Sequence, residues 1–279
     1  LSIFWSGSDT RDIQTYEVSV GTTAGYSNVV VWTDVGTETS IVISDLTLSN
    51  IAYYANIRVT DDAGNVSAVL SSDGVTIDTG SPIAGVVGDG DLEYTASNDT
   101  LDISWTGFSD AVSGISHYEY ALGTSAGASD ITTWTGLGLV TETTLAELSE
   151  LVTDGGTYYA SIHAIDSVGN VSAFASSDGI TIDISTPVTG IVSDALDAED
   201  LDWSNESNQL HASWTGFSDD LSGIDHYEYA FGTSAGGSDI LDWTTTTDTS
   251  ASTSNELVSG TQYFASVIAF DVVGNATTS

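Results

Sequence analysis

The chain has no cysteine, no methionine and only 2 prolines among its 279 residues. Without cysteine it can form neither a disulfide nor a thiolate metal site, so its stability must come from a packed core or from a bound metal. Lysine is missing as well, which excludes lysine–asparagine isopeptide cross-links. No run of about 18 apolar residues occurs, so the sequence predicts no membrane-spanning helix and no direct membrane insertion.

Positive charge is almost absent. Arg11 and Arg58 are the basic side chains besides four histidines, against 40 acidic residues, and the formal net charge is −38. Such a chain repels nucleic acid and anionic surfaces, so we expect no nucleic-acid partner. The same imbalance attracts divalent cations, and it suits saline or calcium-rich surroundings. We therefore expect an extracellular or cell-surface location.

One sequence pattern occurs three times along the chain. Asp-x-x-Gly-Asn begins at Asp61, Asp166 and Asp271, with equal spacings of 105 residues (166 − 61 and 271 − 166). Tryptophans and tyrosine pairs recur with it: Trp5, Trp105 and Trp214; Tyr53-Tyr54, Tyr158-Tyr159 and Tyr263-Phe264. A repeat of this length is large enough to form a whole domain with its own core, whereas the repeats of solenoid proteins are shorter. The predicted domains are 1–79, 80–184 and 185–279.

Strand signals dominate each copy. Short stretches rich in Val, Ile, Thr, Tyr and Trp are separated by Gly, Asn, Asp and Ser. In the second copy they predict strands near 83–87, 100–106, 115–123, 130–135, 141–148, 156–166 and 171–183. Alternation along 158–164 sends Tyr158, Ala160, Ile162 and Ala164 inward. About seven short strands in each copy predict an all-β fold of tandem antiparallel β-sandwiches.

Several of these residues resemble the fibronectin type III domain of bacterial extracellular proteins. They are the Trp of Ile103-Ser104-Trp105, the Tyr-x-Tyr of Tyr118-Glu119-Tyr120, and Leu257-Val258-Ser259-Gly260-Thr261-Gln262-Tyr263, which is similar to the family's tyrosine corner. Tyr53 and Tyr158 occupy the same place as Tyr263. The resemblance implies an immunoglobulin-like sandwich, and it implies no enzymatic activity because this fold hosts many roles. Arg-Gly-Asp is missing, which leaves integrin-type adhesion without support.

The copies differ at the two ends of the chain. Ser-Ser-Asp-Gly-(Val/Ile)-Thr-Ile-Asp ends at Asp78 and at Asp183, and each time a short linker with a proline follows. We expect the first domain to lack its first strand and the third to lack its last strand. Such a chain would be a segment of a longer array of repeats, and its partners would be the neighbouring copies of the domain. The alternative is that neighbouring molecules supply the missing strands, because a truncated sandwich exposes unpaired edges.

The repeated Asp-x-x-Gly-Asn lies between two strands, which favours a hairpin turn in which the aspartate accepts hydrogen bonds from turn amides. The alternative is a calcium site, because carboxylates and loop carbonyls supply the six to eight oxygen ligands that calcium takes. The sandwich fold brings this turn, the loop after the tryptophan strand and the incoming linker to one pole. The candidate ligands are Asp78, Asp110, Asp166 and Asn170 for the second copy, and Asp183, Asp219, Asp220, Asp271 and Asn275 for the third.

Catalytic motifs are weak. Gly123-Thr124-Ser125-Ala126-Gly127 matches Gly-x-Ser-x-Gly, but it follows a strand in an all-β repeat, and the first copy has Thr23 at the serine position. We therefore expect no enzyme. The predicted function is a structural segment, a stalk, spacer or fibre of a secreted bacterial adhesin or filament. One alternative is a carbohydrate- or receptor-binding module that engages a surface glycan through Trp203. The other is an accessory region of a secreted polysaccharide-degrading enzyme.

Overall fold

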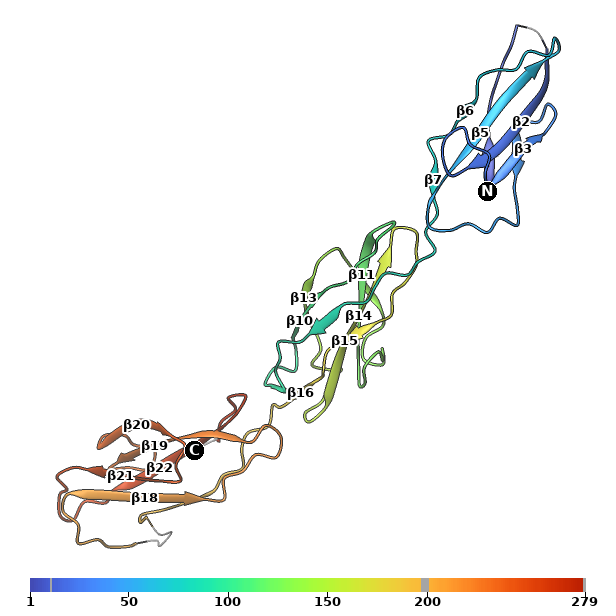
Figure 1. Cartoon of the computed structure of the whole chain (residues 1–279). Coiled ribbons are helices and arrows are strands. Elements are labelled where there is room, and N and C mark those ends of the chain that lie inside the picture. Colours follow the sequence, from blue (N-terminus) through green and yellow to red (C-terminus); the bar gives the residue numbers. More distant parts are fainter. Residues whose placement is uncertain (11, 197–200, 278–279) are drawn as a thin grey trace. The chain divides into compact units, whose positions relative to one another are not determined.

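The structure is a computed structural model that describes residues 1–10, 12–196 and 201–277 (Figure 1). Every regular element in these residues is a β-strand, so they contain no helix that could cross a membrane. Two compact units can be distinguished. The first consists of Leu1–Ala84, Phe108–His117 and Ala164–Ala173, and the second of Gly85–Gly107, Tyr118–His163 and Phe174–Ser279. The predicted domain boundaries stay a prediction.

The first repeat contains two sheets. One consists of β1 (Ser2–Phe4) and β4 (Ser40–Val42). The other has the order β3 (Val30–Asp34), β2 (Ile13–Gly21), β5 (Ala52–Asp61) and β6 (Leu70–Ser71), and β7 (Val75–Thr76) also pairs with β5. Its core is formed by Ile3, Val18, Val20 and Tyr53.

The second repeat has the same two-sheet plan. One sheet has the order β13 (Glu142–Leu145), β10 (Leu101–Thr106) and β8 (Val86–Gly88). The other has the order β12 (Thr135–Gly138), β11 (Ile115–Gly123), β14 (Thr157–Asp166), β16 (Ile180–Ile182) and β9 (Tyr94–Thr95), and β15 (Ala175–Ser176) also pairs with β14. β9 and β16 run parallel. The chain therefore leaves one sheet after β8 and joins the other at β9.

The third repeat pairs β17 (Ile191–Ser193), β18 (Gln209–Thr215) and β21 (Ser250–Ser254) in one sheet. The second sheet has the order β20 (Leu241–Thr246), β19 (Ile224–Gly232) and β22 (Phe264–Asp271). Ala212, Trp214 and Phe231 form its buried core. All three repeats confirm the predicted all-β fold of antiparallel sandwiches.

Period-two patterning places the core. Along β10, Leu101, Ile103 and Trp105 are buried while the residues between them are exposed. The tryptophan of this strand packs edge-on against a tyrosine of the next, as Trp105 does against Tyr118 at 5.5 Å between ring centroids. Trp5 with Tyr16, and Trp214 with Tyr227, repeat this contact. Aromatic rings prefer this geometry because the positive edge of one meets the negative face of the other.

The tyrosine corner is present in all three repeats. The Tyr158 hydroxyl accepts a hydrogen bond from the backbone N–H of Thr153 at 2.9 Å. Tyr53 accepts from Ser49 at 2.9 Å, and Tyr263 from Val258 at 2.8 Å. Each bond links a tyrosine at or just before the start of a long strand (β5, β14 or β22) to the loop that precedes it. The predicted corner is therefore confirmed.

Some predicted strands differ from those observed. The stretch 171–183 does not form one strand, because Gly179 has a φ of 101° and separates β15 from β16. The strand predicted at 130–135 lies instead at 135–138. Ser161 lies on the face of β14 opposite to Ala160 and Ile162, yet it is fully buried, and its hydroxyl accepts from the N–H of Gly127 and bonds Ser176.

Candidate metal centres

The Asp-x-x-Gly-Asn segment forms the predicted hairpin turn. Oδ1 of Asp166 accepts hydrogen bonds from the backbone N–H groups of Val168, Gly169 and Asn170 at 2.7–2.9 Å. Gly169 has a φ of 99°, a conformation that only glycine adopts without a steric cost. The same turn follows Asp61 and Asp271. The aspartate is thus fixed by backbone donors, and its second oxygen remains for other partners.

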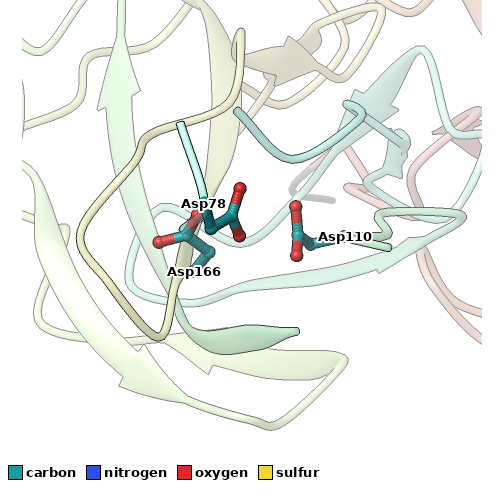
Figure 2. A group of neighbouring side chains, drawn as sticks. All are labelled: Asp78, Asp110 and Asp166. Atoms are coloured by element: carbon teal, nitrogen blue, oxygen red, sulfur yellow. The ribbon is translucent and has the colours of Figure 1, made fainter. Parts of the chain in front are cut away.

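Three aspartates from distant segments of the first compact unit converge on one point (Figure 2). Asp78 follows β7, Asp110 lies in the loop after β10, and Asp166 ends β14. One carboxylate oxygen from each lies within 4.8 Å of the others. Asp166 is 2% exposed, while the other two are half-buried. We call this group the first triad.

The second compact unit contains an equivalent second triad. Asp183 follows β16, Asp219 follows β18 and Asp271 ends β22, and their oxygens again lie within 4.8 Å of one another. Two members are spaced 105 residues from their counterparts in the first triad (183 − 78 and 271 − 166). Asp183 and Asp271 are fully buried, at 0% and 1% exposure. The second triad is therefore shielded from water even more than the first.

The turn asparagines hold the triads together. Nδ2 of Asn170 donates to Oδ2 of Asp166 at 2.7 Å and to the backbone carbonyl of Asp78 at 3.4 Å. Asn275 makes the same two contacts, with Asp271 at 2.8 Å and with the carbonyl of Asp183 at 3.0 Å. Both asparagines were predicted as metal ligands. In the structure their amide nitrogens position the aspartates.

Two serines at the triads were not among the predicted residues. The backbone N–H of Ser113 donates to Oδ2 of Asp78 at 3.1 Å, and that of Ser222 donates to Oδ2 of Asp183 at 3.1 Å. Both hydroxyl oxygens are buried and have no hydrogen-bond partner among the described residues. The signal in the sequence was Asp-x-x-Ser-Gly, which begins at Asp110 and at Asp219 but is missing from the first copy.

The triads carry negative charge, and the described residues include no lysine and one arginine, which is bound elsewhere. Burial raises the pKa of Asp166, but the hydrogen bonds from the Asn170 side chain and from three turn amides lower it by more, so the net pKa lies below its ordinary value. Arg58 is bound to Glu17 at 2.7 Å, and Arg11 lies outside the described residues. Ionised carboxylates this close repel one another and favour a bound cation.

The remaining predicted residues lie apart from the triads. Asp220 is exposed and belongs to neither group. In the first repeat, Asp9, Asp61 and Asn65 line a cavity of about 170 Å³, with two carboxylates where each triad has three. Trp203 is 90% exposed.

The spacing within each triad is compatible with one calcium ion. Calcium binds oxygen at about 2.3–2.6 Å, so two ligands on opposite sides of the ion lie at most about 4.6–5.2 Å apart. Oxygens that are within 4.8 Å of one another can therefore share an ion. Three carboxylates supply three to six oxygens, and hydroxyl groups and water complete such shells. The residues present can hold a metal ion.

The Gly-Thr-Ser-Ala-Gly segment does not form the strand–turn–helix elbow of a serine nucleophile. It turns directly after β11, and a hydrogen bond from the Thr124 hydroxyl to Asp130 at 2.7 Å closes the loop before β12. The equivalent loop of the third repeat has the same bond, from Thr233 to Asp239 at 2.8 Å. The loop interpretation of the segment that begins at Gly123 is confirmed, and the third repeat has the same loop.

No family model and no curated protein matches the sequence. Solved structures do match. One, which concerns host cell surface retention of a 1.5-MDa bacterial ice-binding adhesin, is 17% identical, with 97% of this chain and 85% of that chain covered and a TM-score of 0.51. Another, the FN1–FN3 domains of chicken CNTN1, is 18% identical, with 98% and 89% covered and a TM-score of 0.34. At such identities the likeness concerns the fold alone. The fold of this chain is that of tandem fibronectin type III-like, immunoglobulin-like β-sandwiches.

Proposed function

We propose that the chain is a structural repeat segment, a stalk or spacer of a secreted bacterial adhesin or surface filament, which calcium at the two triads makes rigid. The observation that carries this proposal is the recurrence of the triad. The same three acidic positions and the same asparagine bridge occur twice along the chain. A chance cluster of surface acids would not repeat its hydrogen bonds as well as its charges.

The electrostatics support a cation at these positions. Asp183 and Asp271 are fully buried, and no lysine or arginine occurs in the sequence after Arg58. Hydrogen bonds from turn amides and from Asn275 offset part of the charge of Asp271, and a metal ion would balance the charge that the three carboxylates share. The unpaired hydroxyl oxygens of Ser113 and Ser222 are oxygen donors of the kind that calcium accepts.

The position of the ligands supports a mechanical role. Asp78 and Asp183 lie just after the last strand of a repeat, whereas the other two members of each triad belong to the following repeat, one in a loop and one at the end of a long strand. A shared ion would therefore tie the short segment between repeats to two loops and restrict its motion. The fold likeness to a bacterial adhesin supports the same role. The acidic surface also supports it, because like charge keeps repeats from collapsing on one another.

Calcium removal tests this proposal. The chain is measured in chelator and in calcium by calorimetry and by small-angle X-ray scattering. At free calcium one hundred times Kd, binding stabilises the folded state by about 2.7 kcal/mol, which raises Tm, and the scattering should indicate fewer interdomain arrangements. Asp110→Asn combined with Asp219→Asn should lose most of both responses. Asp220→Asn is the matched control for Asp219→Asn alone, because it removes the same single charge from the neighbouring residue, which belongs to neither triad.

The two readouts separate the parts of the proposal. An unchanged Tm would show that the triads bind no calcium. A raised Tm with unchanged scattering would support calcium binding at the triads and would reject their role in rigidity.

A second candidate function rests on Trp203. Its side chain is 90% exposed, far more than the other tryptophans, and it has no counterpart in the other copies. Exposed aromatic rings stack on the apolar faces of sugars and also anchor protein interfaces. Binding to a glycan array that Trp203→Ala abolishes would favour this function. Equal binding by the variant would reject it.

A further inference from the structure

Five Asn-x-Ser/Thr sequons, the acceptor sequences for N-linked sugars, occur along the chain. They begin at Asn65, Asn98, Asn170, Asn205 and Asn275. A folded chain can accept a sugar only where the asparagine amide is exposed and free, because its nitrogen forms the new bond and the sugar is bulky. The five sequons differ in this respect, since they lie in different local structures.

Three sequons belong to the Gly-Asn turns, at Asn65, Asn170 and Asn275. In each of them Nδ2 of the asparagine donates to the aspartate four residues earlier, at 2.7–2.9 Å. In the first of the three, the hydroxyl of Ser67 also accepts the N–H of Val59 at 3.1 Å. These turns must open locally, with loss of the hydrogen bond, before a sugar can be attached.

The sequon at Asn98 is restricted in another way. Asn98 is half-buried in the short segment between β9 and β10. The hydroxyl of Thr100 shares a hydrogen bond of 3.0 Å with that of Ser97, which also accepts the N–H of Thr100 at 3.1 Å. The hydroxyl of this sequon is therefore engaged, and its amide is partly covered.

The sequon at Asn205 is open. Asn205, Glu206 and Ser207 are all exposed, and neither the Asn205 amide nor the Ser207 hydroxyl has a hydrogen-bond partner among the described residues. The backbone is nevertheless held in place. The carbonyl of Ser207 accepts the N–H of Leu257 at 3.0 Å, and the hydroxyl of Ser204 accepts the N–H of Glu206 at 3.1 Å. The third repeat thus presents this sequon just before β18 with its reactive groups free.

An exposed tryptophan lies beside the open sequon. Trp203 is 90% exposed and precedes Asn205 by two positions, whereas the other tryptophans are buried or half-buried. Two residues span at most about 7 Å of chain, so a sugar on the Asn205 amide lies within reach of the indole ring. Aromatic rings offer a flat apolar face on which the apolar face of a sugar can stack. The sugar would supply the partner that the ring lacks in the chain itself.

We infer that Asn205 is the acceptor of an N-linked sugar in the folded chain, and that the ring of Trp203 covers one face of that sugar. The donor is a sugar activated by a diphosphate at its anomeric carbon. The Asn205 amide nitrogen bonds to this carbon, the bond to the diphosphate oxygen breaks with its electron pair, and the amide proton passes to a base of the transferring enzyme. Asn205 belongs to neither triad, so the inference does not depend on calcium.

The inference competes with the second candidate function of Trp203. A ring that covers a sugar of its own chain is not free to bind an external glycan. It also gives a physical reason why the tryptophan occurs in this repeat alone, because the first and second copies have no sequon in the segment before the equivalent strand that is both free and exposed.

A soluble N-glycosyltransferase with uridine diphosphate glucose tests the acceptor on the purified, folded full chain. In chelator, mass spectrometry should show one added hexose, and fragmentation should place it at Asn205. Transfer there should be at least about tenfold faster than at the other four sequons, because those must first open locally. Asn205→Gln and Ser207→Ala should each abolish it. Asn208→Gln is the matched control, because Asn208 is an exposed neighbouring asparagine without a serine or threonine two residues later.

The same reaction on the chain unfolded in urea separates fold from sequence. There the other sequons should accept hexose as well, and the preference for Asn205 should fall. The inference is overturned if the folded chain takes no hexose at Asn205. It is also overturned if the folded chain takes hexose equally fast at the Gly-Asn turns.

Trp203→Ala tests the stacking, because it leaves the sequon intact. In the glucosylated parent chain, NMR should show nuclear Overhauser contacts between the sugar protons and the indole ring, and the sugar should raise Tm. The variant should accept hexose at Asn205 without that rise. Missing contacts in the parent chain, or an equal rise of Tm in the variant, would reject the role of Trp203.

Discussion

The side-chain nitrogen of Asn275 lies 3.0 Å from the backbone carbonyl oxygen of Asp183, a residue 92 positions earlier. Asn170 and Asp78 repeat this contact with the same separation in sequence. The bridge needs no metal, and it brings the triad together before any ion binds. A preformed site of this kind loses less conformational freedom on binding than one that must assemble around the ion.

Replacing the bridge should weaken the third repeat. Asn275→Ala removes two hydrogen bonds, to Asp271 and to the carbonyl of Asp183, at about 1 kcal/mol each. We therefore expect a loss of about 2 kcal/mol in chelator and weaker calcium binding, both measurable by calorimetry. Asn65→Ala is the control, because Asn65 bridges only to Asp61. Equal losses in the two variants would contradict the role of the bridge.

The tyrosine corner should carry measurable stability. Tyr158→Phe removes the partner of the Thr153 N–H at 2.9 Å, and losing such a part-buried hydrogen bond costs about 0.5–1.5 kcal/mol. Calorimetry of the whole chain should show one transition lowered in Tm. Tyr159→Phe removes a hydroxyl from the opposite face of the same strand and should change little. A Tm that drops equally in both variants would point to a general effect on β14.

The Asp130 loop predicts a specific acid response. A hydrogen bond from the Thr124 side chain, and next one from its backbone, hold the pKa of Asp130 below its ordinary value. A lowered folded pKa contributes stability that is complete above the unfolded pKa, about 3.9, and is lost as pH falls through the folded pKa. In the first copy, Asn28 makes the equivalent contacts to Thr22 without a titrating group. Asp130→Asn should therefore flatten the loss of stability below about pH 4.

Unfolding curves recorded from pH 6 to pH 2 check this. Near neutral pH the variant should resemble the parent chain, because the amide oxygen accepts the same backbone N–H. Parallel curves for variant and parent over the acidic range would show that the Asp130 bonds do not contribute to acid sensitivity.

The partner of a β-strand glutamate differs between the first two repeats: it is an arginine in the first and a histidine in the second. Arg58 binds Glu17 through two bonds, of 2.7 Å and 2.9 Å, whereas His163 makes one contact of 2.8 Å with Glu119 at the matching place. His163→Arg should restore the two-bond pair and raise stability by about 0.5 kcal/mol, since such partly exposed pairs are weak. A double-mutant cycle with Glu119→Gln measures the coupling. A coupling of zero would mean that the guanidinium does not reach the carboxylate.

The sequence predicted the sandwich because its signals are local and repeated. Trp105 and Tyr158 stand at positions where period-two alternation and the tyrosine corner agree. The triad members could be named because the turn, the loop and the linker each carry an aspartate that recurs with the domain period. Which amide atom of Asn170 faces Asp166 could not be predicted, since sequence shows the residue type and not its orientation.

Other features had no readable signal. Ser113 contributes to the first triad through its backbone N–H, a group that every residue except proline has. Asp89 looked like one acid among many, because only the three-dimensional crossing between β8 and β9 reveals its burial. The break between β15 and β16 depends on a positive φ at Gly179, in a stretch whose composition favours a continuous strand.

The asparagine bridge also has a consequence for covalent modification. Asn170-Val171-Ser172 and Asn275-Ala276-Thr277 are both acceptor sequons for N-linked glycans. In the folded chain, both amide hydrogens of each asparagine are already donated to aspartate oxygens. The hydroxyl groups of Ser172 and Thr277 are buried as acceptors for the N–H groups of Ala164 and Ala269. A glycan could be attached at these turns only before the chain folds, and it would then block the bridge.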